Sequence, residues 1–124
     1  MSPKVFIAAG ALLAALGIAA GAFGAHALKA RLAPDSLALW QTAAQYHVWH
    51  ALGLALVGLC AIVGAEAVWL RWSGWLMLAG VLLFSGSLYA LALGAPRPLG
   101  VLTPVGGAAL ILSWLALAGA LLRA

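Results

Sequence analysis

The sequence predicts an all-α integral membrane protein, in which residues 1–124 form a single transmembrane domain built as a four-helix bundle. Apolar residues make up 67% of the chain and charged residues only 6%. Soluble domains contain about 45–50% apolar and about 25% charged residues. This small number of charges cannot cover a water-exposed surface. The composition therefore excludes a soluble enzyme, a disordered chain and a coiled coil.

Four long stretches of the sequence carry no charged residue. They are residues 5–28, 36–65, 72–96 and 98–122. Each can supply the roughly 20 helical residues that cross a hydrocarbon core of about 30 Å. Barrel strands would alternate between apolar and polar residues, and these runs do not. The predicted transmembrane helices are residues 5–25, 46–64, 73–93 and 104–122.

The first span carries small residues along one side. At 3.6 residues per turn these residues fall in one narrow stripe, which contains a GxxxG pair. They are Gly10, Ala14, Gly17, Gly21 and Gly24. Small residues let membrane helices approach closely, so we expect the stripe to pack inside the bundle; the alternative is a seam between copies of the chain. The same span could also be a signal peptide that is cleaved after Ala27, although its apolar run is longer than usual.

The second span follows a segment that looks like the start of a helix. Pro34 is followed by Asp35 and Ser36, either of which could cap the helix. Residues 37–45 are amphipathic and predict a short interfacial helix before the span, with its Leu and Trp on the apolar boundary and its Gln residues in water. Within the span, one face is expected to contact lipid through Leu52, Leu56 and Leu59.

The last two spans are marked at their ends by tryptophan and proline. Trp69, Trp72 and Trp75 recur every third residue, which is typical of an aromatic belt at a membrane surface. Thr103 followed by Pro104 fits an N-cap with proline at the first helical position. An even number of spans places both termini on one side, and the basic residues divide equally between the two sides, so they do not predict the orientation.

The net charge of +4 comes from basic residues that are scattered one or two per gap between the apolar runs. A nucleic-acid interface would need them gathered on one face, so we expect the lipid bilayer and no nucleic acid as a partner. Cys60 is the only cysteine and lies in an apolar run. A small buried side chain is the expected role for it.

Polar residues of the spans are predicted to gather in one half of the membrane, because the chain reverses direction at each connection. They are His26, Tyr46, His47, His50, Ser85, Ser87, Tyr89 and Thr103. The opposite half is almost entirely Ala, Leu, Ile, Val and Gly. Polar groups in hydrocarbon are costly unless they are paired. The cluster therefore predicts either a hydrogen-bond network between helices or a polar pocket.

Histidines can bind a metal or haem and can carry protons near neutral pH. No cysteine or carboxylate is placed to complete a metal site. No acidic residue lies within a span to assist a serine–histidine pair or a proton antiporter. We therefore predict no catalytic residue, no metal site and no cofactor. We expect His50 to lie inside the bundle and to bond to Ser85, Ser87 or Tyr89.

Four ordered segments resemble the signatures of one family. They are GAFGAHAL (21–28), QTAAQYH (41–47) with His50, FSGSLY (84–89) and TPVGG (103–107). The family is the small membrane proteins catalogued as domain of unknown function 423, and the resemblance covers nearly the whole chain. It implies four transmembrane helices, an inner-membrane location if the source is bacterial, and no established activity or catalytic residue.

Two functions follow from these features. The first is a non-enzymatic multi-pass protein of the cell inner membrane, acting as a structural, assembly or partner-binding subunit, with a homo-oligomer as one possible assembly. The second is a transporter of a small solute, proton or metal, or a cofactor-binding unit, that uses His26, His47 and His50. Purified protein analysed for metal and for a haem spectrum would separate the two.

Overall fold

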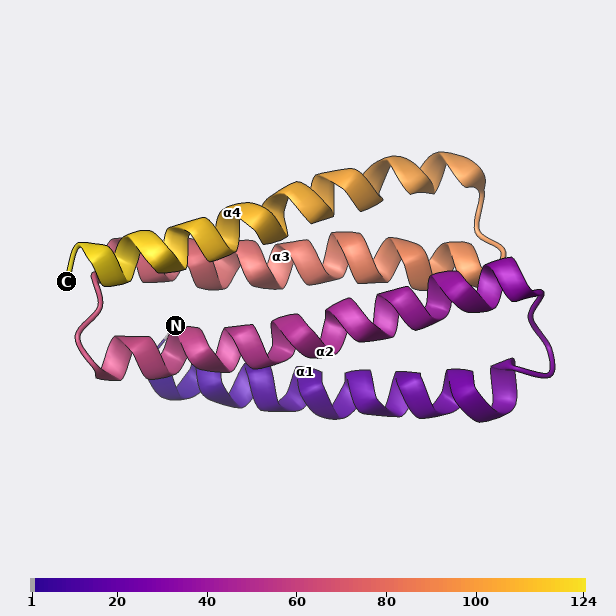
Figure 1. Ribbon diagram of the computed structural model, residues 1–124, viewed down its shortest axis with the longest axis horizontal. Coiled ribbons are helices and arrows are strands. Elements are labelled where there is room, and N and C mark those ends of the chain that lie inside the picture. The colour runs from indigo at the N-terminus through magenta and orange to yellow at the C-terminus, as the bar shows by residue number, and fades with distance from the viewer. Residues whose placement is uncertain (1) are drawn as a thin grey trace.

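The computed structural model describes residues 2–124, and these form four long helices joined by short connections (Figure 1). The helices are α1 (Pro3–Phe23), α2 (Pro34–Ile62), α3 (Ala67–Ala92) and α4 (Leu102–Leu122). A π-helical turn, η1 (Gly24–Leu28), extends α1, and a 3-10 turn, η2 (Arg97–Val101), precedes α4. Each of the four is long and apolar enough to cross a membrane. The predicted all-α membrane architecture is therefore confirmed.

Two of the helix starts have the side-chain caps that orphan backbone N–H groups require. Ser2 immediately precedes the proline at the first position of α1. Its hydroxyl accepts a hydrogen bond from the backbone N–H of Val5 at 3.3 Å. The carboxylate of Glu66 accepts hydrogen bonds from the first turn of α3, from Val68 at 3.2 Å and from Trp69 at 3.0 Å.

The other two helix starts differ from those predicted. Helix α2 begins at Pro34 with Ala33 before it and no side-chain cap, so neither Asp35 nor Ser36 caps the helix. Helix α4 begins at Leu102, because η2 leads into it without a break, and Thr103 is therefore helical rather than an N-cap. The Thr103 hydroxyl is free to bond to α3 instead.

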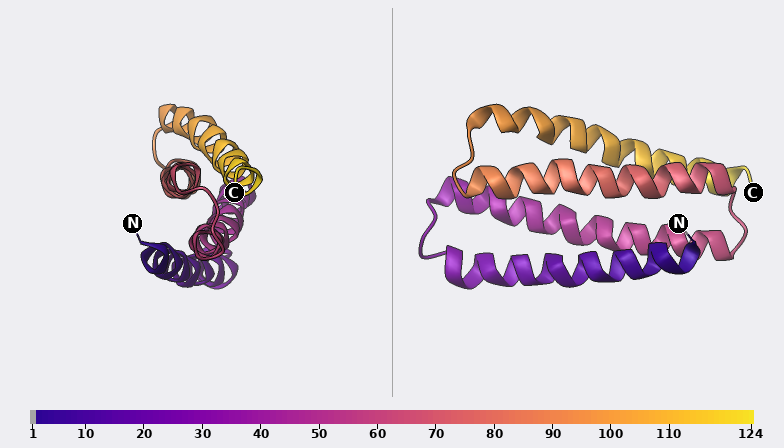
Figure 2. Two further views of the ribbon diagram at one scale, coloured as in Figure 1. Left: turned by 90° about the vertical axis from the view of Figure 1, so that its left-hand side faces the viewer. Right: turned by 180° about the vertical axis from the view of Figure 1, so that it is seen from behind.

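The helices pack in chain order. Helix α1 packs along α2, α2 along α3, and α3 along α4, whereas α2 and α4 touch only briefly. Seen end-on, α1 and α4 lie at opposite edges of an open, curved row (Figure 2). The two ends of the described chain lie toward the same end of the bundle (Figure 1).

The glycine stripe of α1 faces α2 at three positions. An added Cβ at Gly10 would lie 2.6 Å from the carbonyl oxygen of Ala51, and one at Gly17 would lie 2.7 Å from Val48. Gly24 packs against Trp40. Ala14 is half-buried, but a Cβ at Gly21 would meet nothing within 4 Å. The prediction was therefore wrong for Gly21, because no neighbouring helix closely approaches α1 at that position.

The predicted short interfacial helix at residues 37–45 is helical but not separate. It forms the first part of α2, which runs for 29 residues without a break. A helix of that length measures roughly 43 Å, so it extends beyond a hydrocarbon core of about 30 Å. The continuity follows from the absence of any glycine or proline between Ser36 and the span.

Trp40 lies inside the protein instead of on the apolar boundary. It is 9% exposed, and its indole N–H donates to the carbonyl of Ala20 in α1 at 2.8 Å. The ring fits there because Gly24 has no side chain; a Cβ at that position would lie 2.5 Å from the indole. The other face of the ring packs against Tyr89, with 4.6 Å between ring centroids. Trp40 therefore joins α1, α2 and α3.

The outward surfaces agree with the sequence pattern. Leu52, Leu56 and Leu59 are 60%, 42% and 52% exposed, which confirms that this side of α2 faces away from the protein. On the opposite side, Gly53 and Val57 are buried. The face that the sequence assigns to packing is the face that packs.

Candidate functional site

The predicted polar cluster is largely a set of hydrogen bonds between helices. Six of the eight residues form such bonds, and they come from α2, α3 and α4. They are His47, His50, Ser85, Ser87, Tyr89 and Thr103. Tyr46 contributes its backbone carbonyl and its ring, and His26 stands apart.

His50 is buried, as predicted, and both of its ring nitrogens are bonded. It is 6% exposed. Nδ1 lies 2.8 Å from the carbonyl oxygen of Tyr46, one turn earlier in α2, so Nδ1 must carry the proton and donate it. Nε2 then accepts the indole N–H of Trp114 from α4 at 3.0 Å. The predicted partner on α3 was wrong, since the long side chain of Trp114 reaches this nitrogen from α4.

The bonding of His50 has a chemical consequence. A histidine binds a metal through the lone pair of a neutral nitrogen. The Nε2 lone pair of His50 accepts the indole N–H of Trp114. Nδ1 carries the proton that it donates to the carbonyl of Tyr46. His50 therefore acts as a junction between α2 and α4 in this arrangement.

His47 is bonded on one side only. Its Nδ1 lies 2.9 Å from the hydroxyl of Tyr89, which links α2 to α3. The residue is 8% exposed, and Nε2 is a buried atom without a hydrogen-bond partner. The ring lies against Gly17 of α1. The backbone of Leu13 is also near the ring, but it is not positioned to form a hydrogen bond with Nε2. Among the described residues, this nitrogen is the one buried side-chain polar atom left unpaired.

The serines and the threonine of the cluster bond to neighbouring helices. Ser85 donates its hydroxyl proton to the carbonyl of Ala43 in α2 at 2.8 Å. The hydroxyls of Ser87 and Thr103 are 2.5 Å apart and link α3 to α4. Since Ser87 donates to the carbonyl of Phe84 at 3.0 Å, Thr103 is the donor between the two hydroxyls.

An aromatic pocket of about 340 Å³ opens beside His50, where α2, α3 and α4 meet. Its lining residues are Tyr46, His50, Phe84, Gly107, Leu110, Ile111 and Trp114. The ring of Tyr46 is parallel to that of His50 to within 9° and lies 4.6 Å from that of Phe84. The sequence left a hydrogen-bond network and a polar pocket as alternatives; the structure contains the network, and the pocket beside His50 is aromatic rather than polar.

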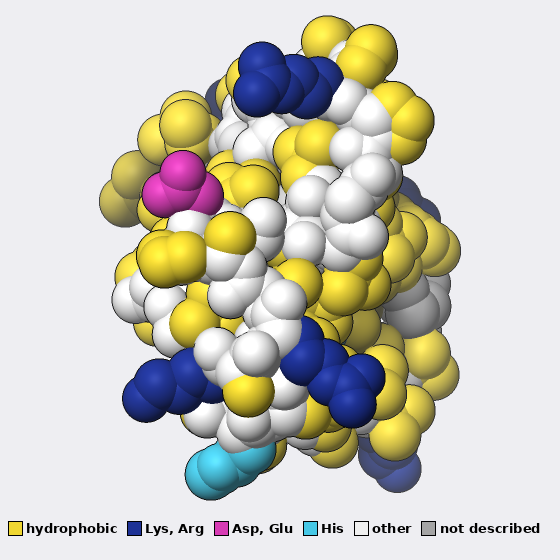
Figure 3. Space-filling model, turned by 90° about the vertical axis from the view of Figure 1, so that its right-hand side faces the viewer, with side chains coloured by type: hydrophobic (Ala, Val, Ile, Leu, Met, Phe, Trp, Pro, Cys, Tyr) yellow, Lys and Arg dark blue, Asp and Glu magenta, His cyan; other side chains and the backbone are white. Residues whose placement is uncertain are grey.

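His26 does not join the cluster. It lies on the π-helical turn η1 and is exposed. Figure 3 shows this end of the molecule, where a histidine and several basic side chains stand at the rim among polar and backbone atoms. His26 is exposed whereas His47 and His50 are buried, so the three histidines do not converge.

Sequence reasoning missed four polar contacts. Trp40 was expected on the apolar boundary and Trp114 was given no role, although each indole donates to another helix. Ser73 donates to the carbonyl of Ser113 at 2.7 Å, and Ser113 donates to Leu110 at 2.6 Å. Both serines are fully buried, so the opposite half is less apolar than predicted. Their position on the glycine-bearing faces of α3 and α4 was the available signal.

The cluster offers little to a metal ion. Within residues 2–124, no three His, Cys, Asp or Glu side chains come together in a group that could hold one. His47 offers one free nitrogen, and Cys60 is buried elsewhere in the core around Val57 and Phe6.

Replacing Trp114 with phenylalanine is expected to destabilise the protein by about 0.6–1.7 kcal/mol, which is the range for hydrogen bonds between membrane helices. The change removes the donor to His50 while keeping an aromatic ring. The free energy of unfolding in mixed micelles would measure it. Trp75→Phe is the matched control, because Trp75 is 49% exposed on α3. Equal losses for both variants would show that the bond contributes nothing.

Comparison with known proteins gives a family and no activity. A model of the family described as "Protein of unknown function (DUF423)" matches residues 20–107. A UPF0382 membrane protein of Staphylococcus epidermidis is 45% identical over 120 residues, covering 97% of each chain. The UPF0382 membrane protein YwdK of Bacillus subtilis is 46% identical over 114 residues, covering 90% of this chain and 91% of its own. No solved structure matches. The chain therefore belongs to the DUF423 family of membrane proteins.

Proposed function

We propose that this protein is a non-enzymatic, partner-binding subunit of a bacterial inner membrane, and that its polar cluster holds the helices together. One observation carries the proposal: six of the eight cluster residues form hydrogen bonds between helices. Polar groups that form hydrogen bonds with each other reduce the free-energy penalty of placing polar atoms in lipid. The bacterial location is supported by relatives named as membrane proteins in Staphylococcus and Bacillus.

The hydroxyl groups are poorly placed for nucleophilic catalysis. A serine nucleophile needs a base that accepts its proton. Ser85 and Ser87 instead donate their protons to backbone carbonyls, and His50 directs its acceptor nitrogen toward Trp114. This arrangement supports a structural role for the cluster.

The structural role is tested by Ser85→Ala and Tyr89→Phe. Each variant should lower the free energy of unfolding by about 0.6–1.7 kcal/mol and should leave the cellular function intact at growth temperature, measured by complementation of a gene deletion. A variant that folds with wild-type stability but loses function would contradict the proposal. Ser36→Ala, at the start of α2 and outside the cluster, serves as the control.

The partner that we propose is a second copy of the chain, which would bind through the outer face of α1. The face opposite α2 carries five exposed alanines within roughly 80° of the helix surface. They are Ala8, Ala11, Ala15, Ala19 and Ala22. Along its length α1 packs on α2, and small residues are the surface through which membrane helices associate.

Cysteine cross-linking tests this assembly. In a Cys60→Ala background, Ala15→Cys should form a disulfide-linked dimer in native membranes under oxidation. Leu59→Cys is the control, because Leu59 is 52% exposed on the outer side of α2. If Ala15→Cys stays monomeric, or if both positions cross-link equally, a dimer through α1 is wrong.

A second candidate function rests on the unpaired Nε2 of His47. A buried nitrogen without a partner suits a proton relay or a single metal–ligand bond in a transporter. Purified protein should contain stoichiometric metal, or proteoliposomes should move protons, and His47→Gln should abolish either signal. Tyr89→Phe would help to assign the signal, since it removes the bond at the other ring nitrogen. No metal and no proton flux would leave the structural role as the function.

A further inference from the structure

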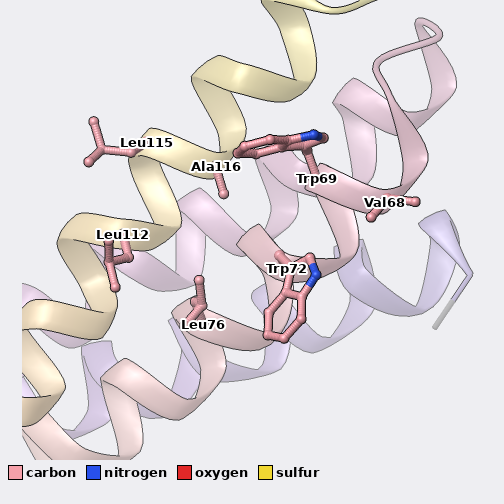
Figure 4. Close-up of a pocket in the computed structure, with 7 residues that line it drawn as sticks. All are labelled: Val68, Trp69, Trp72, Leu76, Leu112, Leu115 and Ala116. Carbon is pink, nitrogen blue, oxygen red and sulfur yellow. The ribbon is translucent and has the colours of Figure 1, made fainter.

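A long apolar groove runs between α3 and α4 near the end of the bundle where α3 begins and α4 ends. Its volume is about 570 Å³. The walls are Trp69, Trp72 and Leu76 from α3 and Leu112, Leu115 and Ala116 from α4 (Figure 4). Trp69 reaches across to α4, where a Cβ at Gly119 would lie 3.0 Å from its ring.

The wall residues of the groove on α3 run from Trp69 to Leu76, about two turns along the helix and in the direction of the lipid tails. Its outer end is at Trp69, in the first turn of α3, and its inner end is at Leu76. Leu76 is roughly 7–8 Å along the helix from Arg71, the charged residue at the membrane surface. The groove therefore covers the outer part of a hydrocarbon core of about 30 Å. An extended acyl chain entering from the membrane surface would follow this path.

One arginine contacts a wall residue of the groove, and a second lines the depression next to it. The guanidinium of Arg123 lies 4.9 Å from the centroid of the Trp69 ring, which fixes it by a cation–π contact. Arg71 lines a second depression that shares Val68 and Trp72 with the groove. Glu66, the acidic residue of this end, uses its carboxylate to cap α3. The positive charge beside the groove is therefore available to a ligand.

We propose that this site binds one phospholipid with an anionic headgroup. One acyl chain lies in the groove between α3 and α4, and the phosphate is held between Arg71 and Arg123. Arginine suits this role, because its planar guanidinium bonds two phosphate oxygens at once. The proposal is independent of the dimer through α1, which uses another face of the molecule.

Charge complementarity favours a lipid over a second copy of the chain. The chain contains two acidic side chains, Asp35 and Glu66. Asp35 lies at the start of α2, at the opposite end of the bundle, and Glu66 is engaged in its own helix cap. A second copy packed on the groove would place arginines against apolar helix surface without a counter-charge, which is unfavourable.

Native mass spectrometry of the full-length protein tests the proposal. The protein would be released from detergent containing equal amounts of phosphatidylglycerol and phosphatidylethanolamine. One retained phosphatidylglycerol per chain is expected, with at least a fivefold preference over the zwitterionic lipid. In the Arg71→Gln, Arg123→Gln double variant this preference should fall to near one. The Arg31→Gln, Arg97→Gln variant, which removes two arginines from the opposite end, should keep it.

A groove-filling variant separates the acyl-chain contact from the charge. Leu115 is 61% exposed at the groove wall, so Leu115→Trp should fill the groove without disturbing the packed interface. It should lower the retained lipid at least threefold, while Leu52→Trp on the outer side of α2 should not. Equal retention of both lipids, or equal loss in the two arginine variants, would overturn the proposal. Retention unaffected by Leu115→Trp would overturn the placement of the acyl chain.

Discussion

Gly106→Ala is expected to destabilise the protein by about 3 kcal/mol, at the upper end of the cost of overpacking. An added Cβ would lie 2.8 Å from Cα of Phe84 and 2.9 Å from the carbonyl carbon of Leu83. Both atoms belong to the backbone of α3, so α4 would have to move as a whole. The free energy of unfolding in mixed micelles, followed by circular dichroism, would measure the loss.

The next residue supplies the control. At Gly107 an added Cβ would lie 3.7 Å from the ring of Phe84, which is an ordinary contact. Gly107→Ala should therefore keep the stability of the parent protein, or raise it slightly through the helix propensity of alanine. If both variants lose the same free energy, the close approach of α3 and α4 at Gly106 is not the cause.

Gly10→Ala is expected to destabilise the protein by about 2–3 kcal/mol through the contact of α1 with α2. Its Cβ would lie 2.6 Å from the carbonyl oxygen of Ala51 and 2.7 Å from the backbone nitrogen of Ala55. Thermal unfolding of purified protein would detect the change. Gly21→Ala, from the same helix, should show no loss, because its Cβ would meet nothing within 4 Å. A loss at Gly21 as large as that at Gly10 would count against this packing.

The sequence was sufficient to predict the spans, because lipid imposes one requirement on all of them. A helix must be predominantly apolar over about 20 residues to cross the membrane, and the chain shows this directly. The orientation of α2 was also predictable, since Gly53 and Val57 alternate with Leu52 and Leu56 at helical spacing. These features depend on one helix and its surroundings, so periodicity along the chain is enough to define them.

Features that depend on two helices were less predictable. The partner of His50 was expected on α3, and the structure places Trp114 of α4 there. The burial of Trp40 depends on the space left by Gly24, sixteen positions earlier. In both cases the deciding residue lies on another helix, and sequence pattern does not specify how helices are arranged side by side.

The order of packing also has a consequence for biogenesis. Because each helix packs on the helix that precedes it in the chain, the contacts are mostly local in sequence, and local contacts form quickly. During synthesis, α1 and α2 can enter the bilayer and close as a hairpin before α3 has left the ribosome. The hairpin of α3 and α4 would then pack against the surface that α2 already presents. The bond from Trp114 to His50 would form last and would lock the second hairpin onto the first.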